Sequence, residues 1–293
     1  MNLSVKNIGL LAIFLATIFL STKSIFAKLL YLDEITPIMI LMYRAIISLP
    51  FFLVPLLKVD WKNTGIKQVM IYGGIGSFIY LVSSIADFIG LLFISASLER
   101  AILFTFPIYV FLLSKESSKI TIVQIGLIFS TVIGLMFMFN PVVIGNIRDT
   151  LVGGGLVLLS AIFWAIFIIY SKHAVQMIGA TAFTSAYMCI STIALVLIFM
   201  IFSKDVTPSF WFEDSVMVYL VLLALMCSII PSYLLSYGVK AISATQTAII
   251  SALGPISTLV LDVIVLNHNI TINEIIGTII VTLSVTYLTR LYK

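Results

Sequence analysis

Residues 90–107 read GLLFISASLERAILFTFP, and residues 238–255 read GVKAISATQTAIISALGP. Aligned at one constant offset, the two stretches share an initial glycine, a central Ile-Ser-Ala and a final proline. A second pair agrees with them, because LATIF (15–19) resembles LSAIF (159–163). Self-similarity of this kind indicates an internal duplication. The chain is therefore predicted to consist of two related halves.

A third pair sets the extent of the halves. KITIVQIG (119–126) resembles NITINEIIG (269–277) with one residue inserted. We therefore predict a first repeat over 1–139, a linker over 140–150 and a second repeat over 151–293.

The composition indicates a membrane protein. Hydrophobic residues make up 61% of the 293 residues and charged residues 10%, against about 25% charged in soluble domains. The net charge of +4 is then no sign of nucleic-acid binding. Cys189 and Cys227 lie inside apolar runs and are expected to pack there. No catalytic residue, metal ligand or cofactor site is predicted.

The apolar runs have the length that crosses about 30 Å of hydrocarbon. Windows of about 19 residues give ten candidate spans: 7–27, 36–57, 68–94, 97–114, 120–139, 151–171, 178–203, 215–239, 244–266 and 273–291. Five spans per repeat is an odd number, so the second repeat enters the membrane from the opposite side. The predicted fold is an all-α polytopic membrane protein with ten transmembrane helices as two inverted five-helix repeats.

The distribution of lysine and arginine predicts the orientation. With the N-terminus inside, the cytoplasmic segments hold Lys6, Lys58, Lys62, Lys67, Lys115, Lys119, Lys172, Lys240, Arg290 and Lys293. The external segments hold Lys28, Arg100, Arg148 and Lys204. The excess inside predicts that both termini are cytoplasmic.

The paired halves, an arginine in span 2 and the two Ile-Ser-Ala turns followed by proline resemble the drug/metabolite transporter superfamily. The chain is most similar to its EamA-type members, over essentially its whole length. The resemblance implies the ten-helix fold and a transporter that exports its substrate. It also implies that the arginine of span 2, Arg44, often helps to hold the fold.

Three ionisable side chains inside the predicted spans are candidate substrate-binding residues. Lys23 lies in the polar run Ser21-Thr22-Lys23-Ser24, which covers every side of a helix; the alternative is that Lys23 snorkels to the headgroups. Arg44 either anchors the fold or contacts substrate. Asp87 is the expected counter-charge, and the sequence leaves open whether it pairs with Lys23 or with Arg44.

Further candidates are assigned by residue type and place. Tyr80, Trp164, Tyr233, Tyr237 and Gln246 on the central spans are expected to line a cavity.

Pro107 and Pro255 occupy equivalent places in the two repeats, where proline should kink a helix. They are predicted as hinges, with fixed bends as the alternative. Glu99 and Arg100 are expected to form a solvated rim at an external turn.

The inverted repeat predicts a secondary transporter with its substrate site at the repeat interface. We expect a small metabolite, an amino acid or a similar amphipathic or zwitterionic solute, to be moved across the cytoplasmic membrane by alternating access. Import on the same fold is the alternative, and an intramembrane enzyme or a channel is the alternative class. The expected partners are the substrate, the lipid bilayer and a coupling proton or ion, with a monomer or homodimer as the assembly.

Overall fold

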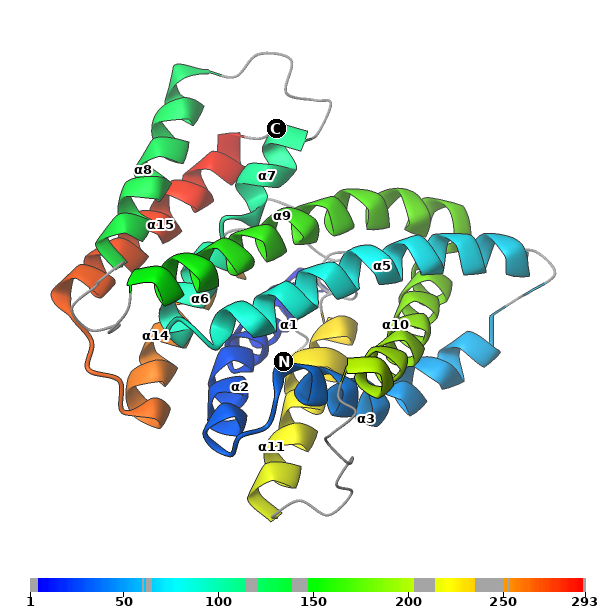
Figure 1. Cartoon of the computed structure of the whole chain (residues 1–293). Coiled ribbons are helices and arrows are strands. Elements are labelled where there is room, and N and C mark those ends of the chain that lie inside the picture. Colours follow the sequence, from blue (N-terminus) through cyan, green and yellow to red (C-terminus); the bar gives the residue numbers. More distant parts are fainter. Residues whose placement is uncertain are drawn as a thin grey trace.

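The computed structural model describes residues 5–59, 61, 65–113, 121–138, 147–202, 214–234, 250–251 and 253–291. Every regular element in these residues is a helix (Figure 1). The first half contains α1 (Val5–Ser21), α2 (Lys23–Leu32), α3 (Pro37–Leu57), α5 (Ile66–Leu91), α6 (Ala96–Leu103), α7 (Phe106–Leu113) and α8 (Ile122–Met138). The second half contains α9 (Ile147–Ile178), α10 (Ala180–Phe202), α11 (Asp214–Ala224), the π-helical turn η1 (Leu225–Ile229), α14 (Leu253–Leu266) and α15 (Ile272–Leu291).

Eight helices in the described residues are long and apolar enough to cross a membrane: Asn7–Leu32, Pro37–Leu57, Ile66–Leu91, Ala96–Leu113, Ile147–Ile178, Ala180–Phe202, Asp214–Leu234 and Ile272–Leu291. The shorter apolar helices α8 and α14 fall within the predicted spans 120–139 and 244–266. The chain is therefore a multi-pass membrane protein whose described residues form helices and no strands. The exact count of ten spans stays a prediction.

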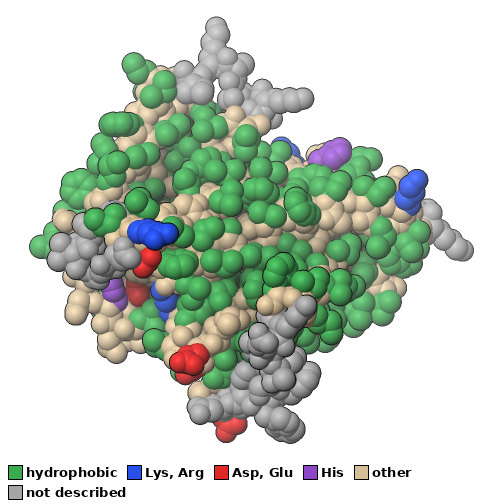
Figure 2. All heavy atoms as spheres, viewed as in Figure 1, with side chains coloured by type: hydrophobic (Ala, Val, Ile, Leu, Met, Phe, Trp, Pro, Cys, Tyr) green, Lys and Arg blue, Asp and Glu red, His purple; other side chains and the backbone are tan. Residues whose placement is uncertain are grey.

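The outer surface of the helices agrees with a lipid environment. Large apolar side chains cover most of the face shown in Figure 2, and charged ones are few. Ile122, Phe202 and Leu283 are each more than 60% exposed. Such an apolar surface would be a liability in water and suits contact with acyl chains.

Two pairs of helices pack closely because glycines meet at their crossings. α5 and α9 lie side by side (Figure 1), and a Cβ added at Gly90 would lie 2.8 Å from the carbonyl oxygen of Gly153. α8 and α15 cross in the same way, where a Cβ at Gly277 would lie 2.5 Å from the carbonyl oxygen of Gly134. Small residues of this kind let transmembrane backbones approach.

The helix starts of α8 and α15, which the predicted duplication would make equivalent, carry the same side-chain arrangement. At α8, Thr121 Oγ1 accepts from the Gln124 amide (3.4 Å), and Gln124 Oε1 accepts from the Thr121 amide (2.9 Å). At α15, Thr271 Oγ1 accepts from the Glu274 amide (3.2 Å), and Glu274 Oε2 accepts from the Thr271 amide (2.9 Å). Both are capping boxes, which satisfy two amides at the helix start.

Candidate functional site

The first span is broken at Thr22, inside the polar run that the sequence singles out. Thr22 Oγ1 donates to the Phe19 carbonyl (2.7 Å), and Ser21 Oγ donates to the Thr17 carbonyl (2.8 Å). Hydroxyls that bond carbonyls of the preceding turn bend helices. The break ends α1 at Ser21 and starts α2 at Lys23.

The break is held from the second half of the chain. The Ser21 carbonyl accepts from Thr258 Oγ1 (3.1 Å), and Ser21 Oγ also lies 3.2 Å from the Gly254 carbonyl, both on α14. Thr22 Oγ1 lies 3.5 Å from Cys227 Sγ in η1. A π-helical turn inside a long helix is common at functional sites, and this one lies directly against the break.

Lys23 lies inside the bundle between two carboxylates. Its Nζ donates to Asp87 Oδ2 on α5 and to Glu99 Oε1 on α6, the latter at 3.0 Å. Ser24 Oγ donates to the other Glu99 oxygen, Oε2. Lys23, Asp87 and Glu99 are 8%, 5% and 0% exposed. We call Lys23, Ser24, Asp87 and Glu99 the charge cluster.

The charge cluster answers two questions that the sequence leaves open. The snorkelling alternative is wrong, because the Lys23 ammonium is buried against carboxylates. Asp87 pairs with Lys23, and the described residues show no ion pair between Asp87 and Arg44.

The expected solvated rim at Glu99 and Arg100 is also wrong. Glu99 is fully buried because α6 begins at Ala96 and its whole first turn is buried in the bundle. Arg100 is only partly exposed. Its Nε is buried without a hydrogen-bond partner in the described residues. Its guanidinium packs against Gly254, where an added Cβ would lie 3.1 Å from Nη2.

Arg44 is buried beside the charge cluster. It is 6% exposed, and its Nη2 donates to the Tyr80 hydroxyl (3.1 Å). The guanidinium carbon lies 5.1 Å from the centre of the Phe88 ring, and Lys23 Nζ lies 5.8 Å from the same centre. No carboxylate in the described residues pairs with Arg44. Phe88 thus contacts both a cation that is paired with carboxylates and a cation that has no carboxylate partner in the described residues.

Tyr80 connects Arg44 to an aromatic cluster formed by Tyr80, Trp164, Phe167, Phe183 and Tyr187. The Tyr80 ring centre lies 6.0 Å from that of Phe167 and 5.4 Å from that of Tyr187. Trp164 stacks on Phe167 at 5.2 Å and 17°. Two of the predicted cavity residues, Tyr80 and Trp164, therefore belong to one group, with Phe167 at its centre.

The other predicted residues lie elsewhere or outside the described residues. Tyr233 is 51% exposed, and its hydroxyl donates to the Phe51 carbonyl at 3.0 Å. Tyr237 and Gln246 lie outside the described residues. Pro107 lies in the first turn of α7, directly after the break at Phe104 and Thr105 that separates α6 from α7.

Pro255 lies in the first turn of α14 and is buried. Further along α14, Asp262 is 2% exposed, and its Oδ2 accepts from the Ser97 amide at 3.1 Å.

A second acidic and basic pair lies between α14 and α15. His268 Nε2 lies 3.0 Å from Glu274 Oε1. This hydrogen bond raises the pKa of His268 above its ordinary value of 6.5. The pair lies on elements different from those that build the charge cluster.

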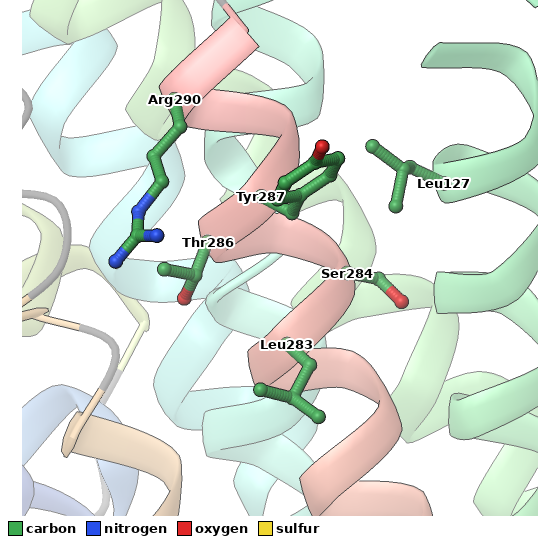
Figure 3. A pocket seen from close by; sticks show the side chains of 6 residues that line it. All are labelled: Leu127, Leu283, Ser284, Thr286, Tyr287 and Arg290. Atoms are coloured by element: carbon green, nitrogen blue, oxygen red, sulfur yellow. The ribbon is translucent and has the colours of Figure 1, made fainter. Parts of the chain in front are cut away.

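The pocket in Figure 3 lies apart from all of these groups. It is a groove of about 460 Å³ on α15, with Leu127 of α8 on its other side. Its further lining residues are Leu283, Ser284, Thr286, Tyr287 and Arg290. Arg290 and Tyr287 point in different directions in the figure and do not converge on a common ligand position. We therefore place the candidate site at the charge cluster and Arg44, where buried polar groups converge.

The described residues contain no group of three or more His, Cys, Asp or Glu side chains placed to hold a metal ion. The convergent groups are instead an ammonium, a guanidinium, two carboxylates and aromatic rings. Such groups recognise the charged ends of a small molecule.

Comparisons with known proteins find similarity to transporters. The model of the EamA-like transporter family matches residues 151–290. An uncharacterized transporter, YcbK, of Bacillus subtilis (strain 168) is 26% identical over 276 residues, which cover 92% of this chain and 88% of the relative. An uncharacterized transporter of Clostridium kluyveri is 25% identical over 296 residues, which cover 93% of this chain and 90% of the relative. A protein known from a crystal structure has a TM-score of 0.66 at 14% identity, covering 97% of this chain and 96% of its own.

Proposed function

We propose that the chain, whose residues 151–290 match the EamA-like transporter family and whose relatives are named transporters, is a secondary active transporter of a small zwitterionic metabolite. The solute is an amino acid or a similar amphipathic molecule. It is exported across the cytoplasmic membrane by alternating access.

The observation that carries this proposal is the state of Arg44. A buried charge without a partner is costly in a membrane, so such residues usually face a partner or a pathway. The guanidinium fork matches a carboxylate in two parallel hydrogen bonds, yet within the described residues Arg44 donates only from Nη2, to Tyr80. A carboxylate of the substrate would supply the missing partner. The adjacent aromatic rings would cover its apolar part.

The proposed architecture is two inverted repeats, 1–139 and 151–293, related by a twofold axis in the membrane plane. The packing of helices supports it, since contacts between the halves occur in pairs that the axis would exchange. α5 packs on α10, and its counterpart α11 packs on α3. α6 and α7 pack on α9, and their counterpart α14 packs on α1 and α2. α3 with α10, α6 with α14 and α8 with α15 form the pairs that such an axis would map onto themselves.

Transport by reconstituted vesicles tests the substrate class. We expect uptake of zwitterionic amino acids by inside-out vesicles, and loss of uptake for the corresponding amides, which lack the carboxylate. Arg44→Gln should abolish transport, and Arg44→Lys should restore little of it because an ammonium has no fork.

Arg290→Gln is the matched control, because Arg290 is exposed and lines the groove of Figure 3. Equal transport of acids and amides, or equal loss in both arginine variants, would contradict the assignment of Arg44. Transport only by right-side-out vesicles would favour import.

Cysteine labelling tests the orientation. In a chain with Cys189 and Cys227 replaced by alanine, a cysteine at Asp33 should react with an impermeant reagent on intact cells. A cysteine at Lys67 should react only after the membrane is opened. Both positions are exposed. The reverse result would refute cytoplasmic termini.

A further inference from the structure

The two carboxylates of the charge cluster are satisfied unequally. Glu99 uses both oxygens, since Oε1 accepts from Lys23 and Oε2 accepts from Ser24. Asp87 uses only Oδ2, toward Lys23. Its other oxygen, Oδ1, is buried and has no hydrogen-bond partner in the described residues. One ammonium therefore serves two carboxylates, and one carboxylate oxygen is left over.

A buried carboxylate oxygen without a donor is costly, because it has lost its water and gained nothing in exchange. Two carboxylates that share one site also disfavour each other's charge. Both effects are relieved when a proton or another cation binds at the free oxygen. Lys23 and Glu99 can then remain as a neutral, fully bonded pair.

Further groups face the charge cluster from the neighbouring elements. Lys28 and Tyr31 on α2, Arg100 on α6 and Cys227 in η1 are each close enough to act on it electrostatically. Arg44 on α3 contacts the Phe88 ring beside it. None of them forms an ion pair with Asp87 in the described residues. Lys23 and Arg100 favour the ionised Asp87 carboxylate, whereas Glu99 and burial favour the protonated one. These opposing influences allow Asp87 to release a proton as well as to bind it.

We propose that Asp87 is the exchange site of the transport cycle, where its free oxygen Oδ1 holds a proton in one half of the cycle and the amine of the substrate in the other. This inference rests on the proposed function, because it assigns the second end of the zwitterion. One cation replaces another, so the carboxylate keeps a counter-charge throughout. The proton released by Asp87 passes to water when the substrate ammonium arrives.

The helix α5 joins this site to Arg44. Tyr80, which bonds Arg44, lies seven residues before Asp87, so the two side chains are two turns apart on nearly the same face. The Arg44 guanidinium carbon and the Lys23 ammonium lie 5.1 Å and 5.8 Å from the centre of the Phe88 ring. A zwitterion with its carboxylate at Arg44 and its amine at Asp87 would follow α5. Because proton and amine compete for one oxygen, the two move in opposite directions, as export driven by an inward proton gradient requires.

Infrared spectroscopy of the purified protein in lipid nanodiscs tests the proton without any substrate. A protonated buried carboxyl has a carbonyl band that shifts when aspartate is supplied with a ¹³C-labelled carboxyl. We expect a shifted band from wild-type protein that disappears on titration to alkaline pH. Absence of a titrating aspartic acid band between about pH 5 and pH 9 would overturn the proposal. This measurement needs no variant to fold.

Variants then assign the band. Asp87→Asn should remove it, whereas the matched control Asp262→Asn should retain it, because Asp262 is equally buried but accepts from the Ser97 amide. A band that persists in Asp87→Asn would refute the assignment to Asp87.

The substrate half is tested with a mixture of the twenty amino acids. The mixture should release protons from wild-type protein, detected with a pH-indicator dye, and should reduce the Asp87 band. Asp87→Asn should release none. A band unchanged by the mixture would overturn the exchange. Failure of every amino acid in the vesicle assay would count against the proposed substrate even where the Asp87 band is present, so the two failures are distinguishable.

Discussion

Replacing Lys23 with methionine keeps most of the length of the side chain and removes its charge. In wild-type protein the ammonium contacts Asp87 and Glu99, and all three residues are buried. Removing one partner of a buried ion pair costs about 3–5 kcal/mol, since the other charge is left uncompensated. We expect Lys23→Met to reduce the free energy of unfolding by this amount.

The double variant Lys23→Met/Asp87→Asn should recover part of the loss, because one of the two orphaned carboxylates is gone. Groups in direct contact couple by about 0.5–3 kcal/mol, and the close contact of Lys23 with Asp87 places this pair in the upper part of that range. The control cycle combines Asp87→Asn with Arg44→Gln. We expect those losses to add within about 0.5 kcal/mol, because Asp87 and Arg44 form no ion pair in the described residues.

Unfolding by SDS, followed through tryptophan fluorescence, provides the free energies. Additive losses for Lys23 with Asp87 would show that the pair does not exist in the membrane. Coupling of Asp87 to Arg44 instead of to Lys23 would show that the partners are exchanged. Either result would refute the arrangement on which the transport proposal depends.

Two further predictions concern the scaffold. Gly277→Ala should lower the free energy of unfolding by about 1–3 kcal/mol, because the added Cβ would lie 2.5 Å from the Gly134 carbonyl oxygen. Gly126→Ala should cause no such loss, since no atom lies within 4 Å of a Cβ added there. Equal losses in the SDS titration would contradict this. His268→Ala should lower the thermal midpoint at pH 6 and leave it unchanged at pH 9. The hydrogen bond that the His268 imidazolium donates to Glu274 raises the pKa of His268. Its stabilisation is therefore present below pH 6.5 and is lost as the pH rises through the raised pKa. A loss independent of pH would contradict that.

The positions of the helices follow from the sequence because apolar length is a local property. The runs of 7–27 and 36–57 predict Asn7–Leu32 and Pro37–Leu57 closely. The break at Thr22 is harder to predict from the sequence, since it depends on hydroxyl groups that donate to carbonyls of the preceding turn. The signal that could have found it is the row of three hydroxyl residues around Lys23.

The partners of the buried charges could not be predicted from the sequence. Glu99 lies 75 residues from Ser24 and 76 from Lys23, in a short turn where exposure is the ordinary expectation. Its burial is set by how α6 packs against α2 and α14. The choice of Asp87 between Lys23 and Arg44 likewise depends on distances between helices, which no local pattern contains.

Phe88 is the residue through which the two candidate sites would influence each other, and its role can be measured. Its ring lies 5.1 Å from the Arg44 guanidinium and 5.8 Å from the Lys23 ammonium. A desolvated cation over an aromatic face is worth about 2 kcal/mol. Phe88→Leu should therefore lower the free energy of unfolding by about 1–2 kcal/mol more in wild-type protein than in the Arg44→Gln variant. The loss of side-chain volume is the same in both backgrounds, so it cancels in this difference. An equal cost in the two backgrounds would show that Phe88 only fills space, and substrate at Arg44 would then need another route to affect Asp87.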